Sequence, residues 1–270
     1  MRLAEYTEAP IEQSDYPAPN FEVREFARTA AGSHRDSLNL TSYRANPLSS
    51  ESLRALRYLQ IIERATMTHL RSVLVTATHK DARITAFLTT WAYEKFWIAD
   101  ALEQIAFANA PEGTEPDRAR FRTPRERTIR EAVYANIVGV PMIALHMTLG
   151  TVDEWLTQAA YARISALEGN QQLTETVEHL LELKRRQLSF FEPQARFRLA
   201  ESPRAARLTR TRLAKTPWPI GARAEPRTET DNFFSHAFGS TPEIIAELDA
   251  RVDTLPGQRG LSVLRKAARL

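Results

Sequence analysis

The stretch of sequence that decides the fold is HLLELKRRQLSFFEP, from His179 to Pro193. Its apolar residues recur at the period of an α-helix, with Lys184 and Gln187 in the middle of the same stripe. A charge buried without a partner is costly, so a lysine at that place needs opposite charges on the neighbouring helices. The stretch therefore predicts a core helix with a buried lysine. Its apolar stripe consists of Leu180, Leu181, Leu188 and Phe191.

Three other parts of the chain show the same helical period. Pro141 lies within one of them, where it predicts a kink or a break. Short connections within each pair of helices and a longer one between the pairs predict an all-α, ferritin-like four-helix bundle over residues 49–202. The predicted helices, including the one quoted first, span residues 50–78, 81–109, 128–167 and 172–200.

The two ends of the chain differ from this central part. Residues 1–48 contain four prolines and no sustained period, which predicts an N-terminal arm that packs on the body or stays mobile. Residues 203–270 are predicted to form a C-terminal extension with short helices, because their apolar content is too thin for a second domain. The clearest helix signal there is Thr241 as a cap, followed by Pro242.

Composition and charge limit the classes of function. The 270-residue chain has a formal net charge of +3 and no cysteine. No apolar run reaches the length of a membrane span and the first residues lack the apolar core of a signal peptide, so the expected location is the cytoplasm. Basic residues gather in residues 118–130 and 196–215, either as a solvated surface or as a docking site for an acidic protein partner. Nucleic-acid binding ranks last, because neither segment has a recognised reading motif.

Each predicted helix carries one charged residue in its apolar seam, and these residues are regularly spaced. The first two are 31 residues apart and the last two 30, so the charges of each antiparallel pair fall at about the same height. Three carboxylates at one level need a cation or bound protons. Two alternatives stay open: the glutamates lie on helix surfaces, or the lysine extends to solvent beside its arginine neighbours. The four residues are Glu63, Glu94, Glu154 and Lys184.

The charged positions in these seams resemble the pattern of a known family over about residues 50–200. The chain resembles the di-iron carboxylate proteins of the ferritin-like superfamily, and more distantly the acyl-carrier-protein desaturases and actinobacterial ferritin-like proteins. The resemblance implies a Glu helix followed by a Glu-x-x-His helix, twice, since positions i and i+3 face the same metals. The matching segments are WAYEKFW with Glu94 and Trp97, EWLTQAAY from Glu154 to Tyr161, and LKRRQLSFF with Lys184 and Gln187.

The chain departs from that pattern at three positions. Trp97 and Gln187 stand where the histidines are expected, and Lys184 stands where a carboxylate is expected. We therefore expect no cofactor, with the lysine replacing metal charge and Trp97 filling the space of an imidazole and a metal. Three glutamates and one lysine would leave a formal charge of −2, which should raise the pKa of at least one carboxyl. The implied ligands that remain are Glu63, Glu94 and Glu154.

Two functions follow from these observations. The first is a non-catalytic scaffold or partner-binding pseudo-enzyme, expected to form a homodimer like relatives of this layout. The alternative is an oxidase or oxygenase with a metal-free site, or one holding a single iron or manganese ion, that acts on an apolar or carrier-bound substrate. Tyr161 is more typical of a core aromatic than of a redox residue. The central pocket candidates are Glu63, Glu94, Trp97, Glu154, Tyr161, Lys184 and Gln187.

Overall fold

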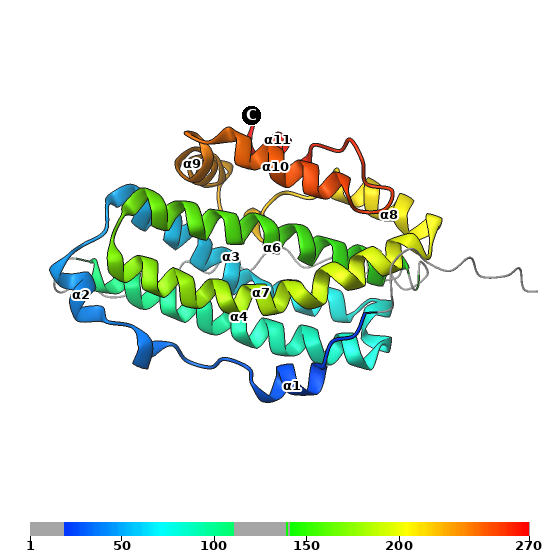
Figure 1. Cartoon of the computed structure of the whole chain (residues 1–270), viewed down its shortest axis with the longest axis horizontal. Coiled ribbons are helices and arrows are strands. Elements are labelled where there is room, and N and C mark those ends of the chain that lie inside the picture. Colours follow the sequence, from blue (N-terminus) through cyan, green and yellow to red (C-terminus); the bar gives the residue numbers. More distant parts are fainter. Residues whose placement is uncertain (1–18, 111–138, 140, 270) are drawn as a thin grey trace, which may run out of the picture.

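The computed structural model describes residues 19–110, 139 and 141–269, and these residues form helices and connections without a β-strand (Figure 1). The predicted all-α class is confirmed. The described part is built around four long helices that lie along one another as a bundle. They are α3 (Ser50–Leu74), α4 (Ala82–Ala108), α6 (Pro141–Glu168) and α7 (Gln171–Ala200).

Local sequence signals set the ends of these helices. The side chains of Ser49, Asp81 and Asn170 accept hydrogen bonds from the first turns of α3, α4 and α7. Helix α3 is shorter than predicted, because Thr76 caps a separate 3-10 turn, η2 (Ala77–Lys80). Helix α6 begins at Pro141, where the sequence predicted a kink or break. The earlier part of that predicted helix, residues 128–138 and 140, lies outside the described residues.

The chain forms two antiparallel hairpins, α3 with α4 and α6 with α7. At one end of the bundle, the backbone N–H of Ser49 donates to Glu168 over 2.9 Å and that of Leu48 donates to Asn109 over 2.7 Å. Asn109 follows α4 directly, so α4 ends where α6 also ends. Helix α4 therefore ends at one end of the bundle, and α6 begins at the other end, beside η2.

The C-terminal part packs on the bundle over α6 and α3 (Figure 1). It contains α8 (Pro203–Leu213), α9 (Arg227–Phe238), α10 (Pro242–Asp253) and α11 (Val263–Ala268). Thr241 and Pro242 signalled α10 in the sequence, whereas α8 and α9 were not located there. Buried side chains from the whole C-terminal part join the main core of the bundle, among them Leu213, Trp218, Phe233, Phe238 and Ile245.

The described part of the N-terminal arm lies against α4 and α7 and includes α1 (Val23–Arg28), η1 (Arg35–Ser37) and α2 (Leu40–Ala45). Arg35 pairs with Asp100 of α4 at 2.9 Å, and the hydroxyl of Tyr43 lies 2.9 Å from that of Thr176 on α7. The arm is thus attached along much of its described length. Among the helices described, none combines the length and apolar character needed to cross a membrane.

Candidate functional site

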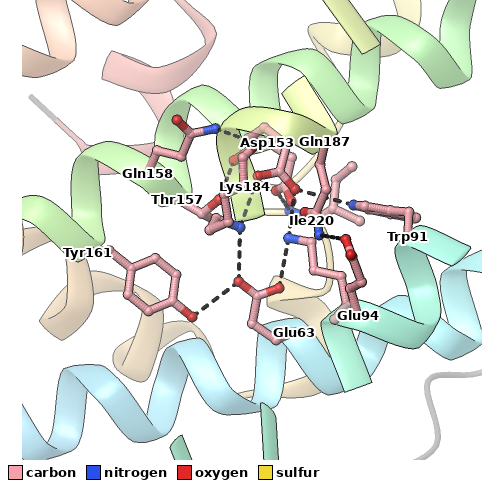
Figure 2. Close-up of polar contacts among 12 residues, drawn as sticks. Glu63, Trp91, Glu94, Asp153, Thr157, Gln158, Tyr161, Lys184, Gln187 and Ile220 are labelled. Atoms are coloured by element: carbon pink, nitrogen blue, oxygen red, sulfur yellow. Dashed lines mark hydrogen bonds and ion pairs between the residues drawn. The ribbon is translucent and has the colours of Figure 1, made fainter. Parts of the chain in front are cut away.

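Four charged side chains, one from each long helix, form a closed ring at the centre of the bundle. The Lys95 ammonium lies 2.7 Å from Oε2 of Glu63 and 2.8 Å from Oε1 of Glu154. The Lys184 ammonium lies 3.1 Å from Oε1 of Glu63 and 2.9 Å from Oε2 of Glu154. Each carboxylate therefore forms ion pairs with both lysines, and each lysine forms ion pairs with both carboxylates. Figure 2 shows Lys184 and Glu63 facing each other across this centre.

The ring is removed from solvent and carries no net charge. Its side chains are at most 1% exposed. Burial alone would raise the pKa of Glu154, but the charges of Lys184 and Lys95 outweigh it and bring that pKa to about 2. Burial likewise opposes the charge on Lys95, yet Glu154 and Glu63 raise its pKa above the ordinary value. The stabilisation from Glu154 is present above the ordinary carboxyl pKa and is lost as pH falls towards 2.

Neutral donors complete the surroundings of the ring. The hydroxyl of Tyr161 donates to Oε1 of Glu63 over 3.1 Å, and the indole N–H of Trp91 donates to Oε1 of Glu154 over 3.3 Å. Burial raises the pKa of Tyr161 well above its ordinary value, and the neighbouring Glu63 adds to that shift. Tyr161 therefore stays a hydrogen-bond donor. The donors fix the rotamers of both carboxylates, so the ring has one defined arrangement.

Glu94 has a different set of partners, although it is also fully buried. Its Oε2 accepts from Nε2 of Gln187 over 2.8 Å, and its Oε1 accepts from the backbone N–H of Ala31 over 3.0 Å. The Arg186 guanidinium lies 3.7 Å from Oε1. Glu94 thus links α4 to α7 and to the N-terminal arm, and it is compensated mainly by neutral N–H groups.

The structure brings together three of the predicted seam charges and corrects the fourth. Lys184 pairs with Glu63 and Glu154 as predicted, but on α4 the ring takes Lys95 and not its neighbour Glu94. The predicted formal charge of −2 is therefore wrong, because a second lysine was missed. Helix α4 is buried on most sides, so apolar spacing could not tell which of two adjacent charges faces the centre. A seam of Trp91, Lys95, Ile98 and Leu102 fits the helical period as well as the seam through Glu94.

Trp97 does not fill the bundle centre. Its ring is partly exposed and packs edge-on against Phe96, with ring centroids 5.3 Å apart, and against Tyr93 at 6.3 Å. With Lys95 in the ring, the residue one helical turn further on is Ile98, which is buried. Trp97 is therefore not the residue that faces the bundle centre one turn after the ring residue of α4; Ile98 is.

Asp153 is a further buried acid that the sequence did not single out. Its Oδ1 accepts from the backbone N–H of Ile220 over 2.7 Å, in the segment before the 3-10 turn η4 (Ala222–Ala224). Burial raises the pKa of Asp153 to about 7, against the lowering effect of Lys95. The C-terminal helices pack on α6, the helix that carries Asp153. The hydrogen bond from Ile220 to Asp153 therefore attaches the C-terminal part to the bundle beside the ring.

The fold and the site together define an all-α protein of two antiparallel helix hairpins around a neutral ring of buried ion pairs. Within the described residues, no group of three or more histidine, aspartate and glutamate side chains is arranged to hold a metal ion. Comparison with protein-family models, with curated proteins and with solved structures found no match for the chain.

Proposed function

We propose that this protein is a ferritin-like bundle that has lost its di-iron site and works as a non-catalytic scaffold or partner-binding protein. The observation that carries the proposal is the ring, in which every carboxylate oxygen of Glu63 and Glu154 has an ammonium group within 3.1 Å. A metal ion bound there would displace both lysines and strand their charges in the core. The two lysines thus supply the positive charge that metals would supply.

The order of the helices supports the ferritin-like assignment. Two antiparallel hairpins, with one long connection between opposite ends, are the arrangement of ferritin-like bundles. One ring member comes from each long helix, as the ligands of a di-iron centre do. The substitution pattern is also coherent, because two glutamates and two lysines form a neutral set without any metal.

The size of the space near the ring favours a scaffold over an oxidase or oxygenase. A cavity that reaches Trp91 is lined by residues including His69, Leu88 and Phe191, and it measures about 10 Å³. That volume holds roughly one water molecule. A fatty or isoprenoid substrate would have to reach the ring, whereas the four ring side chains are at most 1% exposed, which supports the non-catalytic proposal.

The partners proposed are a second copy of the chain and an acidic protein, in the cytoplasm. Exposed apolar side chains on α3 and α4, Met67, Tyr93, Phe96 and Phe107, support a homodimer, and light scattering at micromolar concentration tests it. Of the two basic segments, residues 118–130 lie outside the described residues. In residues 196–215, Arg196, Arg198 and Arg210 make internal contacts, so a docking site there would use the exposed side chains of Arg204, Arg207 and Lys215.

The test of the main proposal is the metal content of the full-length protein, produced in cells supplied with iron and manganese and purified without a metal-binding tag. Far less than one iron or manganese ion per chain is expected. Near-stoichiometric iron or manganese that disappears in the Glu63→Gln/Glu154→Gln variant would overturn the proposal. That variant keeps the shapes of both side chains and therefore serves as a matched control for metal held at the ring.

A further inference from the structure

A second polar site lies away from the ring, between the N-terminal arm and the bundle. It is a cavity of about 80 Å³, which we call the arm pocket. The arm forms one wall, and α4 and α7 form the others. Its polar lining consists of His34, Ser37, Gln172, Glu175, Thr176 and His179. The volume is large enough for an ion with bound water.

His34 is the buried polar group of this pocket. The residue is 5% exposed, and within the described part of the chain its Nε2 has no hydrogen-bond partner. A buried ring nitrogen without a partner is costly, which points to a ligand that supplies the missing interaction. The backbone of His34 is held firmly, because its carbonyl accepts from the Ser37 hydroxyl over 2.8 Å and the next residue, Arg35, pairs with Asp100.

A second imidazole and a carboxylate stand at the mouth of the pocket. The His179 ring centroid lies 5.3 Å from that of His34, with the rings at 77° to each other. Glu175 and His179 are four residues apart on α7, which places their side chains on one helix face. Both are exposed, so their side chains can rotate towards a ligand without repacking the core.

The chemistry of these groups selects the class of ligand. Two imidazoles can give two nitrogen donors, and imidazole suits zinc and related transition metals. A carboxylate at the mouth disfavours an anion and attracts a cation. In four-coordinate zinc sites, two nitrogens and one carboxylate oxygen leave one position for water. Among the described residues, no three ligand side chains are already placed around one metal position. The exposed side chain of Glu175 would therefore have to rotate to supply the third ligand.

We propose that the arm pocket binds one divalent transition-metal ion of the zinc class, held by His34 and His179 and completed by Glu175. Such an ion joins the arm to α7, because His34 belongs to the arm and the other two ligands to the helix. It would hold the arm on the bundle close to Ala31, whose backbone N–H donates to Glu94. The proposal does not depend on the chemistry of the ring.

The test is a titration of the tag-free, full-length protein with Zn²⁺ by calorimetry and with Co²⁺ by visible absorption. One saturable site per chain and a Co²⁺ spectrum of low-symmetry, four-coordinate type are expected. His179→Ala should weaken binding by more than about tenfold, since even outer partners of a metal ligand change affinity by 10–100-fold. Glu175→Gln should weaken it by a smaller factor. Both side chains are exposed, so these variants are expected to fold.

Two controls separate this site from unspecific binding. Glu178→Gln removes an exposed acid on the same helix, and His79→Ala removes an exposed imidazole at the other end of the bundle. Both should bind Zn²⁺ like the wild type. Absence of saturable binding by the wild type, or equal affinity of wild type and His179→Ala, would overturn the proposal. The iron and manganese content of His179→Ala is measured as well. This variant leaves the ring side chains in place, so its iron and manganese content tests the ring proposal separately from zinc binding in the arm pocket.

Discussion

Two groups of buried carboxylates in the same bundle are compensated in different ways. Glu63 and Glu154 each have two ammonium partners, whereas Glu94 has an amide, a backbone N–H and a more distant guanidinium. The first arrangement is ionic and depends on one residue from each long helix. The second is built largely from neutral donors and depends on the arm. The comparison shows that burial alone does not decide how a carboxylate is stabilised, because the neighbouring elements supply the partners.

The ring should be the more sensitive of the two groups to loss of a partner. Lys95→Ala or Lys184→Ala leaves two buried carboxylates with a single cation, and each should cost about 3–5 kcal/mol of unfolding free energy. Urea unfolding at pH 7 measures this loss. Lys80→Ala is the matched control, because Lys80 is exposed, and it should change stability by less than about 0.5 kcal/mol. A neutral effect of Lys184→Ala would show that its ammonium does not lie in the ring.

Glu94 should be less costly to remove than a ring lysine. Glu94→Ala leaves the Gln187 amide and the Ala31 N–H without their acceptor, at about 2–3 kcal/mol. Glu94→Gln should cost less, because its amide oxygen still accepts one of these bonds. Urea unfolding of both variants, beside Lys184→Ala, gives the order. A larger loss for Glu94→Gln than for Lys184→Ala would break the distinction between the two groups.

Asp153 extends the comparison to an acid that, among the described residues, forms no ion pair with a lysine. Its raised pKa of about 7 means that the folded state keeps the proton that the unfolded state has already lost, so the penalty grows with pH between about 4 and 7. Asp153→Asn removes that titration while its amide oxygen still accepts from Ile220. Relative to wild type, the variant should gain roughly 2–3 kcal/mol on going from pH 5 to pH 8, most of it below pH 7. Denaturant unfolding at both pH values measures the gain, and a pH-independent difference would contradict it.

Arg186 should give the smallest effect. Its side chain is 39% exposed and 3.7 Å from Glu94, so the ion pair is screened by solvent. Arg186→Ala should cost about 0.5–1 kcal/mol, partly through its contacts with Thr29 of the arm. Arg185→Ala is the matched control, since Arg185 is exposed on the same helix. A loss as large as that of a ring lysine would mean that Glu94 depends on ionic compensation after all.

The sequence predicted the bundle well because its helices carry strong caps and sustained periods. The predicted ranges 81–109 and 172–200 lie within two residues of the bounds of α4 and α7, and the spacing of Glu63, Glu154 and Lys184 placed these charges at one height. The same reasoning chose the wrong ring residue on α4. Glu94 and Lys95 are adjacent and both buried, and the helical period fits a seam through either of them.

Contacts between elements far apart in sequence were beyond prediction. Asp153 meets Ile220 only because the C-terminal helices fold back over α6. His34 meets His179 only because the arm lies against α7. The sequence around one residue of either pair does not specify its partner. Both contacts therefore had to be read from the structure.

Neutralisation of the central carboxylates by buried lysines can be measured with a double-mutant cycle between Glu63→Gln and Lys184→Met. Unfolding free energies of the wild type, both single variants and the double variant are measured at pH 7. The double variant should lose less than the sum of the single losses, by about 0.5–3 kcal/mol, because each single variant strands the other charge. The cycle between Glu63→Gln and Lys80→Met, with an exposed lysine, should be additive. Additive losses for Glu63 and Lys184 would contradict this neutralisation.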